Sequence, residues 1–198
     1  MPYSITRGDP ALRSRLEGQL HGLDRVDDAM ADAIVTAWAT SITASAFDDL
    51  ADVPWDPGHA AYRLLTHVNE VTRNGLRFAA AAAEEWHHKV DLSVLVPILI
   101  LHDVDKPMLF EPAPDGSFAW SALSAELPHG VIGGMICKEL GLGRAVVATV
   151  STHSPAMPFR GKSFEAWVLF YADHFSCDNE LLRAGMRPVY ELLSSRLR

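Results

Sequence analysis

Hydrophobic residues recur at steps of three and four positions through most of this chain, which is the spacing of one face of an α-helix. The pattern is clear over residues 24–50, and it returns over residues 59–89. The second segment includes a run of alanines at 79–83 that strongly favours a helix. Gly75 leaves open whether this segment is one helix or two. Residues 52–58, rich in proline and glycine, form a loop between the two segments.

Residues 91–104 can be interpreted in two ways. Their β-branched side chains and Pro97 suggest a strand, whereas their leucines fall on one face of a helix. Asp91 and Ser93 are both suitable N-caps, and a proline is tolerated in the first turns of a helix. We therefore predict a helix that ends before Pro107, because the residue that precedes a proline is disfavoured in the α conformation.

The rest of the chain alternates turns with further helical stretches. Residues 111–117 are predicted to form a loop, with a short hairpin at residues 118–120. Further helices are predicted at residues 129–140, 144–153, 163–178 and 180–198. Since an ordinary helix has about 11–12 residues, we expect about seven to nine helices in all. The predicted fold is all-α, a single-domain helical bundle.

The charge balance and the apolar segments exclude several classes of protein. The 198 residues include 17 Lys and Arg against 25 Asp and Glu, for a formal charge of −8. This balance argues against a nucleic-acid polymer as partner, because such binding needs clustered basic side chains. The longest apolar run, at residues 94–101, is far shorter than the ~20 residues that span a bilayer. Without an apolar leader, the chain is expected to be soluble and cytoplasmic, with no membrane partner.

The chain has nine histidines but only two cysteines, which lack the spacing of a zinc or redox motif. Several histidines and aspartates lie within otherwise apolar stretches. They are His67, His102, Asp103, His129, His153 and Asp173. Taken singly, each is best explained as a buried side chain that forms hydrogen bonds. Burial of His102 and Asp103 together is costly, however, unless something such as a divalent cation compensates for their lost hydration. The set therefore predicts a metal site.

The order of these six residues resembles the HD superfamily of metal-dependent phosphohydrolases, whose signature is H…HD…D, with two extra histidines in members that bind two metals. The local sequences ILHDVDKP, PHGVIGG and YADH are similar to the HD turn, the start of the next helix and the closing aspartate helix of that family. The resemblance covers residues 60–178. It implies an HD-type helical bundle in which residues 59–198 form the metal-binding domain. Residues 1–58 would be an N-terminal helical extension packed on that core.

The resemblance also implies a ligand set for two divalent metal ions. The ligands implied for the first ion are His67, His102, Asp103 and Asp173, and those for the second are Asp103, His129 and His153. Imidazole and carboxylate ligands suit Fe, Mn, Co, Ni or Zn, and we favour Fe or Mn. Lys106 corresponds to a lysine common in the hydrolases, where it would act in catalysis with Asp103 by stabilising charge on the phosphate. The alternative for Lys106 is a solvated lysine in a turn.

The chain departs from the pattern of the family at two places. Asp105 occupies a position where many members have glycine. Ser154 follows His153 where the cyclic-dinucleotide phosphodiesterases of the superfamily have a second histidine, and their GYP motif is missing. These differences argue against hydrolysis of cyclic di-GMP. Arg144 and Arg160 are the candidate cations for an anionic substrate, and Arg160 belongs to a loop that could act as a lid.

Together, these features predict a metal-dependent phosphohydrolase, either a phosphomonoesterase or a phosphodiesterase. It would act on a small phosphorylated metabolite or nucleotide through a metal-activated water. One alternative is an HD-type mixed-valence di-iron oxygenase, which has the same ligand set and cleaves a C–C or C–P bond. A second alternative is a non-catalytic metal-binding interaction domain. The expected partner is an anionic small molecule, and the sequence leaves a homodimer open.

Overall fold

The computed structural model describes residues 1–155, 157, 161–189 and 191 of a largely helical chain. The helices are α1 (Pro10–Gln19), α2 (Asp28–Thr43), α3 (Leu64–Trp86), α4 (Leu92–Leu101), α5 (Lys106–Leu109), α6 (Leu123–Glu126), α7 (Val131–Glu139), α8 (Arg144–Thr152) and α9 (Phe164–Arg183). A hairpin of β1 (Phe110–Pro112) and β2 (Phe118–Trp120) pairs Phe110 with Trp120, which confirms the hairpin predicted at residues 118–120. The largely helical fold is likewise confirmed.

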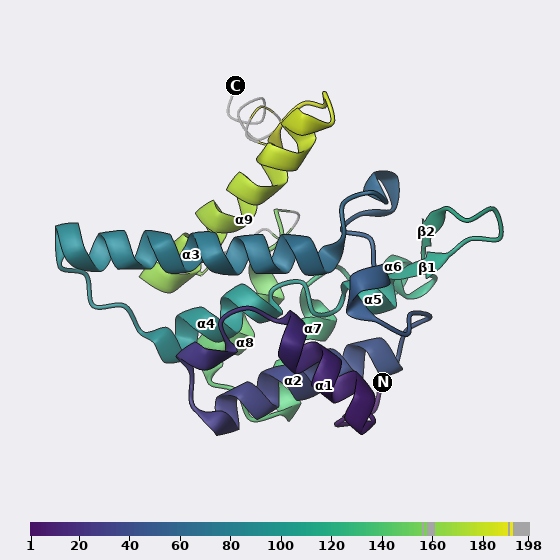
Figure 1. The fold of residues 1–198 in the computed structure, drawn as a ribbon, viewed down its shortest axis with the longest axis horizontal. Helices are drawn as coiled ribbons and strands as arrows, with labels where there is room; N and C mark the ends of the chain where they lie inside the picture. The colour runs from purple at the N-terminus through teal and green to yellow at the C-terminus, as the bar shows by residue number, and fades with distance from the viewer. Residues whose placement is uncertain (156, 158–160, 190, 192–198) are drawn as a thin grey trace.

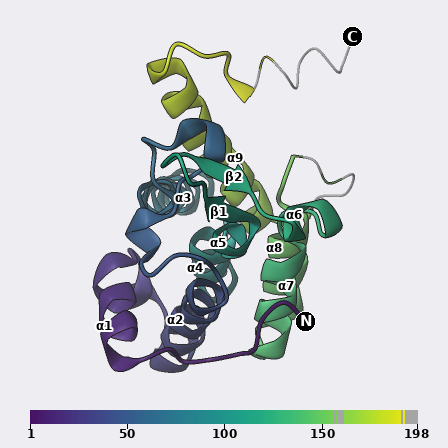
Figure 2. The same cartoon turned by 90° about the vertical axis from the view of Figure 1, so that its right-hand side faces the viewer.

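Helix α4 lies at the centre of the fold, with α1 and α2 on one side and α7 and α8 on the other (Figures 1 and 2). It contacts α2, α3, α8 and α9, and residues 95–101 are fully buried. A helix that is apolar on every face is stable only inside such a core. The side chain of Asp91 accepts a hydrogen bond from the Ser93 main chain and caps the helix. The prediction of a helix rather than a strand is therefore confirmed.

Helix α3 runs without interruption from Leu64 to Trp86, so the alternative of two shorter helices is excluded. Gly75 lies where α3 meets α4, and a Cβ atom at this position would be 2.7 Å from Leu99 Cδ1 and closer still to Cδ2. The glycine therefore permits a close approach between two helices and does not break one. This approach brings the start of α3 alongside the end of α4, where the candidate ligands lie.

The N-terminal part of the chain contains a helix that the periodicity did not predict. Helix α1 begins with Pro10, and the side chain of Asp9 caps it by accepting a hydrogen bond from the Leu12 main chain at 2.8 Å. Its buried leucines, Leu12 and Leu16, join the same core as α2 and α4. On α2, Trp38 Nε1 donates to the Ile100 carbonyl of α4 at 3.2 Å. Residues 24–50 are thus helical only over Asp28–Thr43, with short 3₁₀ turns (Leu23–Arg25 and Leu50–Asp52) at the edges.

Helix α9 extends beyond its predicted end and includes Glu180, so a separate helix does not begin at that residue. The chain leaves the helix at Ala184 and Gly185, where a positive φ of 71° suits glycine. Of the helix predicted at residues 180–198, positions 190 and 192–198 lie outside the described residues.

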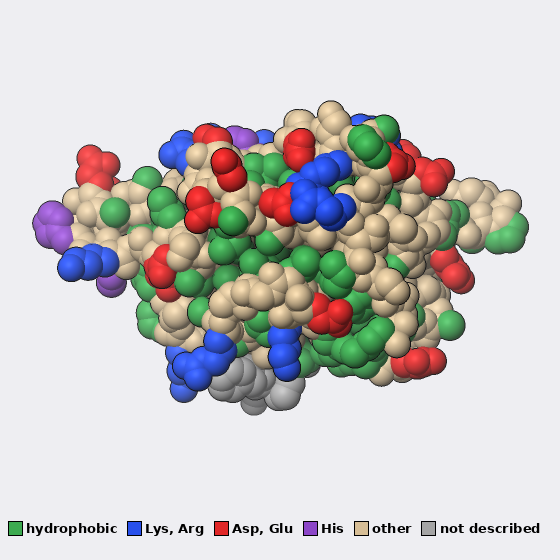
Figure 3. Space-filling view, turned by 90° about the horizontal axis from the view of Figure 1, so that it is seen from below, with side chains coloured by type: hydrophobic (Ala, Val, Ile, Leu, Met, Phe, Trp, Pro, Cys, Tyr) green, Lys and Arg blue, Asp and Glu red, His purple; other side chains and the backbone are tan. Residues whose placement is uncertain are grey.

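The surface seen from below in Figure 3 carries acidic and basic side chains among hydrophobic ones. Acidic and basic groups both occur on several parts of this face. Within the described part of the chain, no helix is both long and apolar enough to cross a membrane.

Candidate metal centre

The six predicted ligand residues converge from five segments of the fold. His67 lies in the first turn of α3, His102 and Asp103 follow α4, His129 precedes α7, His153 follows α8, and Asp173 lies within α9. Their polar atoms meet where these segments come together. The fold therefore brings into contact the side chains that the resemblance implies, although they lie up to 106 residues apart in the sequence.

The first group of atoms surrounds Asp103 Oδ2. His67 Nε2 lies 3.4 Å from this oxygen and 3.2 Å from Asp173 Oδ1, while His102 Nε2 lies 3.5 Å from Asp103 Oδ2. The two imidazole nitrogens, His67 Nε2 and His102 Nε2, are 3.2 Å apart. Carboxylates and neutral imidazole nitrogens that face one another across such distances repel unless a proton or a cation lies between them.

The second group surrounds the other oxygen of the same carboxylate. His129 Nε2 lies 2.8 Å from Asp103 Oδ1, and His153 Nε2 lies 3.5 Å from it. The atoms of this second group, like those of His67, His102 and Asp103, all lie within 4.8 Å of one another. Asp103 thus presents one oxygen to each group, which is the arrangement required of a carboxylate that bridges two ions.

The main chain fixes the ring orientation of two of the histidines. His102 Nδ1 lies 3.0 Å from the carbonyl oxygen of Leu99, and His153 Nδ1 lies 2.9 Å from that of Val150. Because a carbonyl oxygen only accepts, each Nδ1 carries the proton and each Nε2 keeps its lone pair for the centre. This is the tautomer that a metal-binding histidine needs.

Burial and neighbouring charges set the protonation of the cluster. Burial lowers the pKa of His102 to about 4, so this ring is neutral at physiological pH. Burial opposes the charged form of Asp103, but Lys106 and His102 outweigh it and hold the pKa well below its usual range. Burial also opposes ionisation of Asp173, and hydrogen bonding with His67 reverses the effect and lowers its pKa. The first group therefore combines a neutral His102 imidazole with ionised carboxylates.

Lys106 begins α5 and turns back toward the cluster. Its Nζ lies 2.8 Å from Asp103 Oδ2, donates to the Trp55 carbonyl at 3.1 Å and lies 5.2 Å from the centre of the Trp55 ring. The side chain is 13% exposed, which excludes the alternative of a solvated turn lysine. Its ammonium group is thus held beside the carboxylate that the two groups share.

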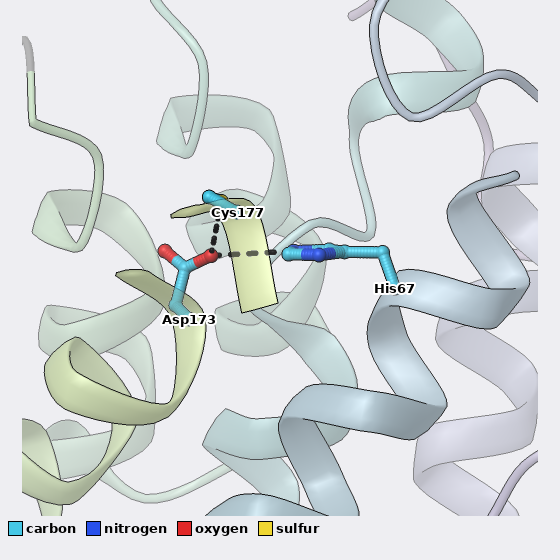
Figure 4. Close-up of side chains that lie close together, drawn as sticks. All are labelled: His67, Asp173 and Cys177. Atoms are coloured by element: carbon cyan, nitrogen blue, oxygen red, sulfur yellow. Dashed lines mark hydrogen bonds and ion pairs between the residues drawn. The ribbon is translucent and has the colours of Figure 1, made fainter. Parts of the chain in front are cut away.

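Two residues at the centre were not predicted to act there. Asp105, noted only as a departure from glycine, is fully buried and contacts His129. Cys177 lies one turn after Asp173 on α9, and its Sγ is 3.4 Å from Asp173 Oδ1 in the group with His67 that Figure 4 shows. Burial raises the pKa of Cys177, so it acts as a thiol donor to the carboxylate. The spacing of four residues after Asp173 is the sequence signal that could have identified it.

Two cavities open beside the cluster and share His153 and Asp173 as wall residues. The smaller, about 150 Å³, also contacts Lys106, His174 and Cys177. The larger, about 270 Å³, lies between α8 and α9 and has mainly apolar walls. Its aromatic lining residues are Trp167, Phe170 and Tyr171. A chamber lined by ionisable side chains, next to one lined by aromatic side chains, suits a small molecule with a charged group and an organic group.

The structure does not bring Arg144, one of the two predicted substrate cations, to the cluster. Arg144 is exposed in the first turn of α8, whereas His153 follows the last turn of the same helix. At 1.5 Å of rise per residue, the two lie about 13 Å apart along the helix axis. Arg160 lies outside the described residues. Of the described residues that were predicted to meet substrate, Lys106 is the cation placed at the centre.

Comparison with protein-family models, with curated proteins and with solved structures gives no match for this chain. The chemistry of the convergent side chains is thus the basis on which a function can be inferred.

Proposed function

We propose that this chain is an HD-type phosphohydrolase that binds two divalent transition-metal ions. The observation that carries the proposal is the placement of Asp103, whose two oxygens face separate groups of histidine nitrogens. The first ion would be held by His67, His102, Asp103 and Asp173, and the second by Asp103, His129 and His153. This assignment uses the six side chains that the resemblance to the HD superfamily implies.

The donor atoms fit such ions. His102 Nε2 is fully buried, carries a lone pair and faces another imidazole nitrogen and a carboxylate. Buried imidazole and carboxylate groups crowded at these distances are costly to desolvate, and a metal ion between them compensates for this cost. Imidazole and carboxylate ligands suit Fe, Mn, Co, Ni or Zn, and the protonated thiol of Cys177 adds no soft ligand.

The residues around the ligands suit the hydrolysis of a phosphate ester. When bound, two such ions lower the pKa of a water molecule and neutralise charge on a phosphoryl oxygen. Lys106 contributes a fixed positive charge at the smaller cavity, where a phosphate group would bind. The apolar cavity between α8 and α9 would accept the organic part of the substrate. We therefore infer a small phosphorylated metabolite or nucleotide as substrate.

The first test combines metal analysis with a substrate panel. The purified chain should contain about two Mn or Fe ions per molecule and release phosphate from p-nitrophenyl phosphate or nucleotides with added Mn²⁺ or Co²⁺. Asp103→Asn and His153→Gln should lower this activity by at least ~100-fold, and Asp103→Asn should reduce the metal content. Asp24→Asn and His21→Gln, which change exposed side chains outside the ligand set, are the matched controls and should behave as wild type.

Other outcomes of the same measurements would contradict the hydrolase proposal. An iron-loaded chain that consumes oxygen with a phosphonate or polyol, and releases no phosphate from esters, would instead support the di-iron oxygenase. A chain with full metal content and no activity of either kind would support the interaction domain. If Asp103→Asn retains the metal content of the wild type, the ligand assignment itself is wrong.

A further inference from the structure

Asp105 is a fully buried carboxylate that joins the turn after α4 to the start of α7. Its Oδ1 lies 2.7 Å from His129 Nδ1. Its Oδ2 accepts hydrogen bonds from the Gly130 main chain at 2.7 Å and from the Gly133 main chain at 3.4 Å. Both oxygens are therefore occupied by groups from one segment, which begins with a candidate metal ligand.

The position of His129 in the chain explains why it needs such a partner. His102 and His153 each follow a helix, so a carbonyl three residues earlier is available to Nδ1. His129 instead precedes α7, in a segment that Pro128 and Gly130 keep out of helical conformation. Leu127 and Pro128 separate it from α6, so its ring does not directly follow a helix as the other two do. Asp105, from another part of the chain, supplies the missing acceptor.

The contact places a proton on Nδ1 and fixes the direction of the ring. With Nδ1 donating to Asp105, His129 Nε2 points at Asp103 Oδ1, 2.8 Å away. Gly130 supports the same geometry, because its φ of 95° and the nearby Val150 carbonyl, 2.8 Å from where a Cβ would lie, favour glycine at this site. The carboxylate and the backbone thus hold His129 on the side of Asp103 that faces His153.

We propose that Asp105 is a positioning residue that sets the affinity of the second metal position through His129. This inference rests on the proposed two-metal centre and concerns only the position formed by Asp103, His129 and His153. Without Asp105, the His129 ring can rotate, and one ligand of that position is lost for much of the time. Asp105 contacts neither His67 nor Asp173, which are two ligands of the first position. That position should therefore keep its ion.

The test measures the metal-to-protein ratio and the binding isotherm of the full-length chain with Mn²⁺. Wild type should bind two ions, and Asp105→Ala should bind the second about 10–100-fold more weakly. Asp105→Asn has one oxygen, which can serve His129 or Gly130 but not both, so its second affinity should be intermediate. His129→Ala should lose the second ion, and adding Asp105→Ala to it should cause no further change in metal binding.

A control separates positioning from simple capping of α7. Asp27→Ala removes the aspartate that caps α2, whose side chain accepts from the Met30 main chain at 2.8 Å. It should lower thermal stability as loss of a helix cap does, yet retain two ions with wild-type affinity. If Asp105→Ala does not fold, the Asp105→Asn variant decides by the same isotherm.

The outcomes distinguish this inference from the proposed function. If Asp105→Asn and Asp105→Ala bind both ions as wild type does, or if the double variant binds more weakly than His129→Ala, the positioning role is wrong while the hydrolase proposal survives. If wild type binds two ions and Asp105→Ala loses one, but no phosphate ester is cleaved, positioning is supported and the hydrolase proposal fails. A wild-type chain that binds no transition metal overturns both.

Discussion

The ammonium group of Lys106 lies 2.8 Å from Asp103 Oδ2, so it is held at the cluster by the carboxylate and by the Trp55 carbonyl. We expect Lys106→Gln to keep the metal content of wild type and to lower the rate of phosphate release by about 100-fold, because a preorganised charge beside the phosphate is lost. Steady-state kinetics with saturating Mn²⁺ and elemental analysis measure the two effects. Lys138→Gln, an exposed lysine of α7, is the control. Unchanged kinetics in Lys106→Gln would assign this lysine a structural role only.

His129 gives the metal-free chain a pH-dependent stability. Burial opposes its charged form, but Asp105 and hydrogen bonds to Asp103 and Asp105 outweigh burial and raise the pKa from 6.5 to about 9. A raised pKa in the folded state stabilises the fold below the unfolded-state value, near pH 6.5, and this contribution is lost as the pH rises through about 9. Urea denaturation with a chelator at pH 6, 7.5 and 9 should show a shrinking difference between wild type and His129→Gln. If the difference in the free energy of unfolding between the two proteins does not change with pH, His129 is not charged in the folded, metal-free chain.

The convergent residues are predictable because each interrupts an apolar stretch, and a polar group in such a place needs a partner. The sequence does not reveal every partner. Asp105 lies in a turn, where an aspartate is ordinary, and its contact with His129 joins positions 24 residues apart. Arg144 shows the converse case, a residue that the sequence suggests but the fold places elsewhere. Its guanidinium group is a reasonable ligand for an anion, but the length of α8 separates it from the cluster.

At the scale of elements, the almost entirely apolar composition of α4 places this helix at the centre of the fold, whereas the spacing of apolar residues does not reveal α1. Its ten residues hold few apolar side chains, and its local signal is the aspartate cap followed by proline. The end of α9 is also hard to predict, because Glu180 continues the helical pattern and Gly185 provides the turn. Periodicity identifies the long helices because burial of one face recurs over several turns, and it is weak where only two or three turns contribute.

The contact between α3 and α4 leads to a prediction at Gly75. Alanine has a better helix propensity than glycine by about 1 kcal/mol, but a methyl group here would overlap the buried side chain of Leu99. Since overpacking costs about 1–3 kcal/mol, we expect Gly75→Ala to lower the free energy of unfolding by about 1 kcal/mol. Gly18→Ala in α1 is the matched control, because nothing lies within 4 Å of a Cβ there, and it should be neutral or stabilising. Urea denaturation of the three proteins decides, and a more stable Gly75→Ala would show that Leu99 moves aside freely.

At the scale of the whole molecule, the candidate ligands connect segments that are distant along the chain. They come from α3, the turn after α4, the start of α7, the end of α8 and the middle of α9. In the absence of ions, the Asp103 and Asp173 carboxylates face each other unfavourably in a buried centre. Ions bound there would link α3, α4, α7, α8 and α9 through their ligands. Metal loading and global stability are therefore expected to be coupled.

Removal of metal should therefore lower the thermal unfolding midpoint of the entire chain. A ligand at 100 times its Kd stabilises a protein by about 2.7 kcal/mol, which for a chain of this size corresponds to roughly 5–10 °C. We expect Mn²⁺ to raise the midpoint of chelator-treated protein by about this amount, measured by circular dichroism or calorimetry. Asp173→Asn, which changes one proposed ligand of the first ion, should respond less. Because binding to the native state alone produces this shift, an equal midpoint with and without Mn²⁺ would show that the convergent side chains do not form a metal centre.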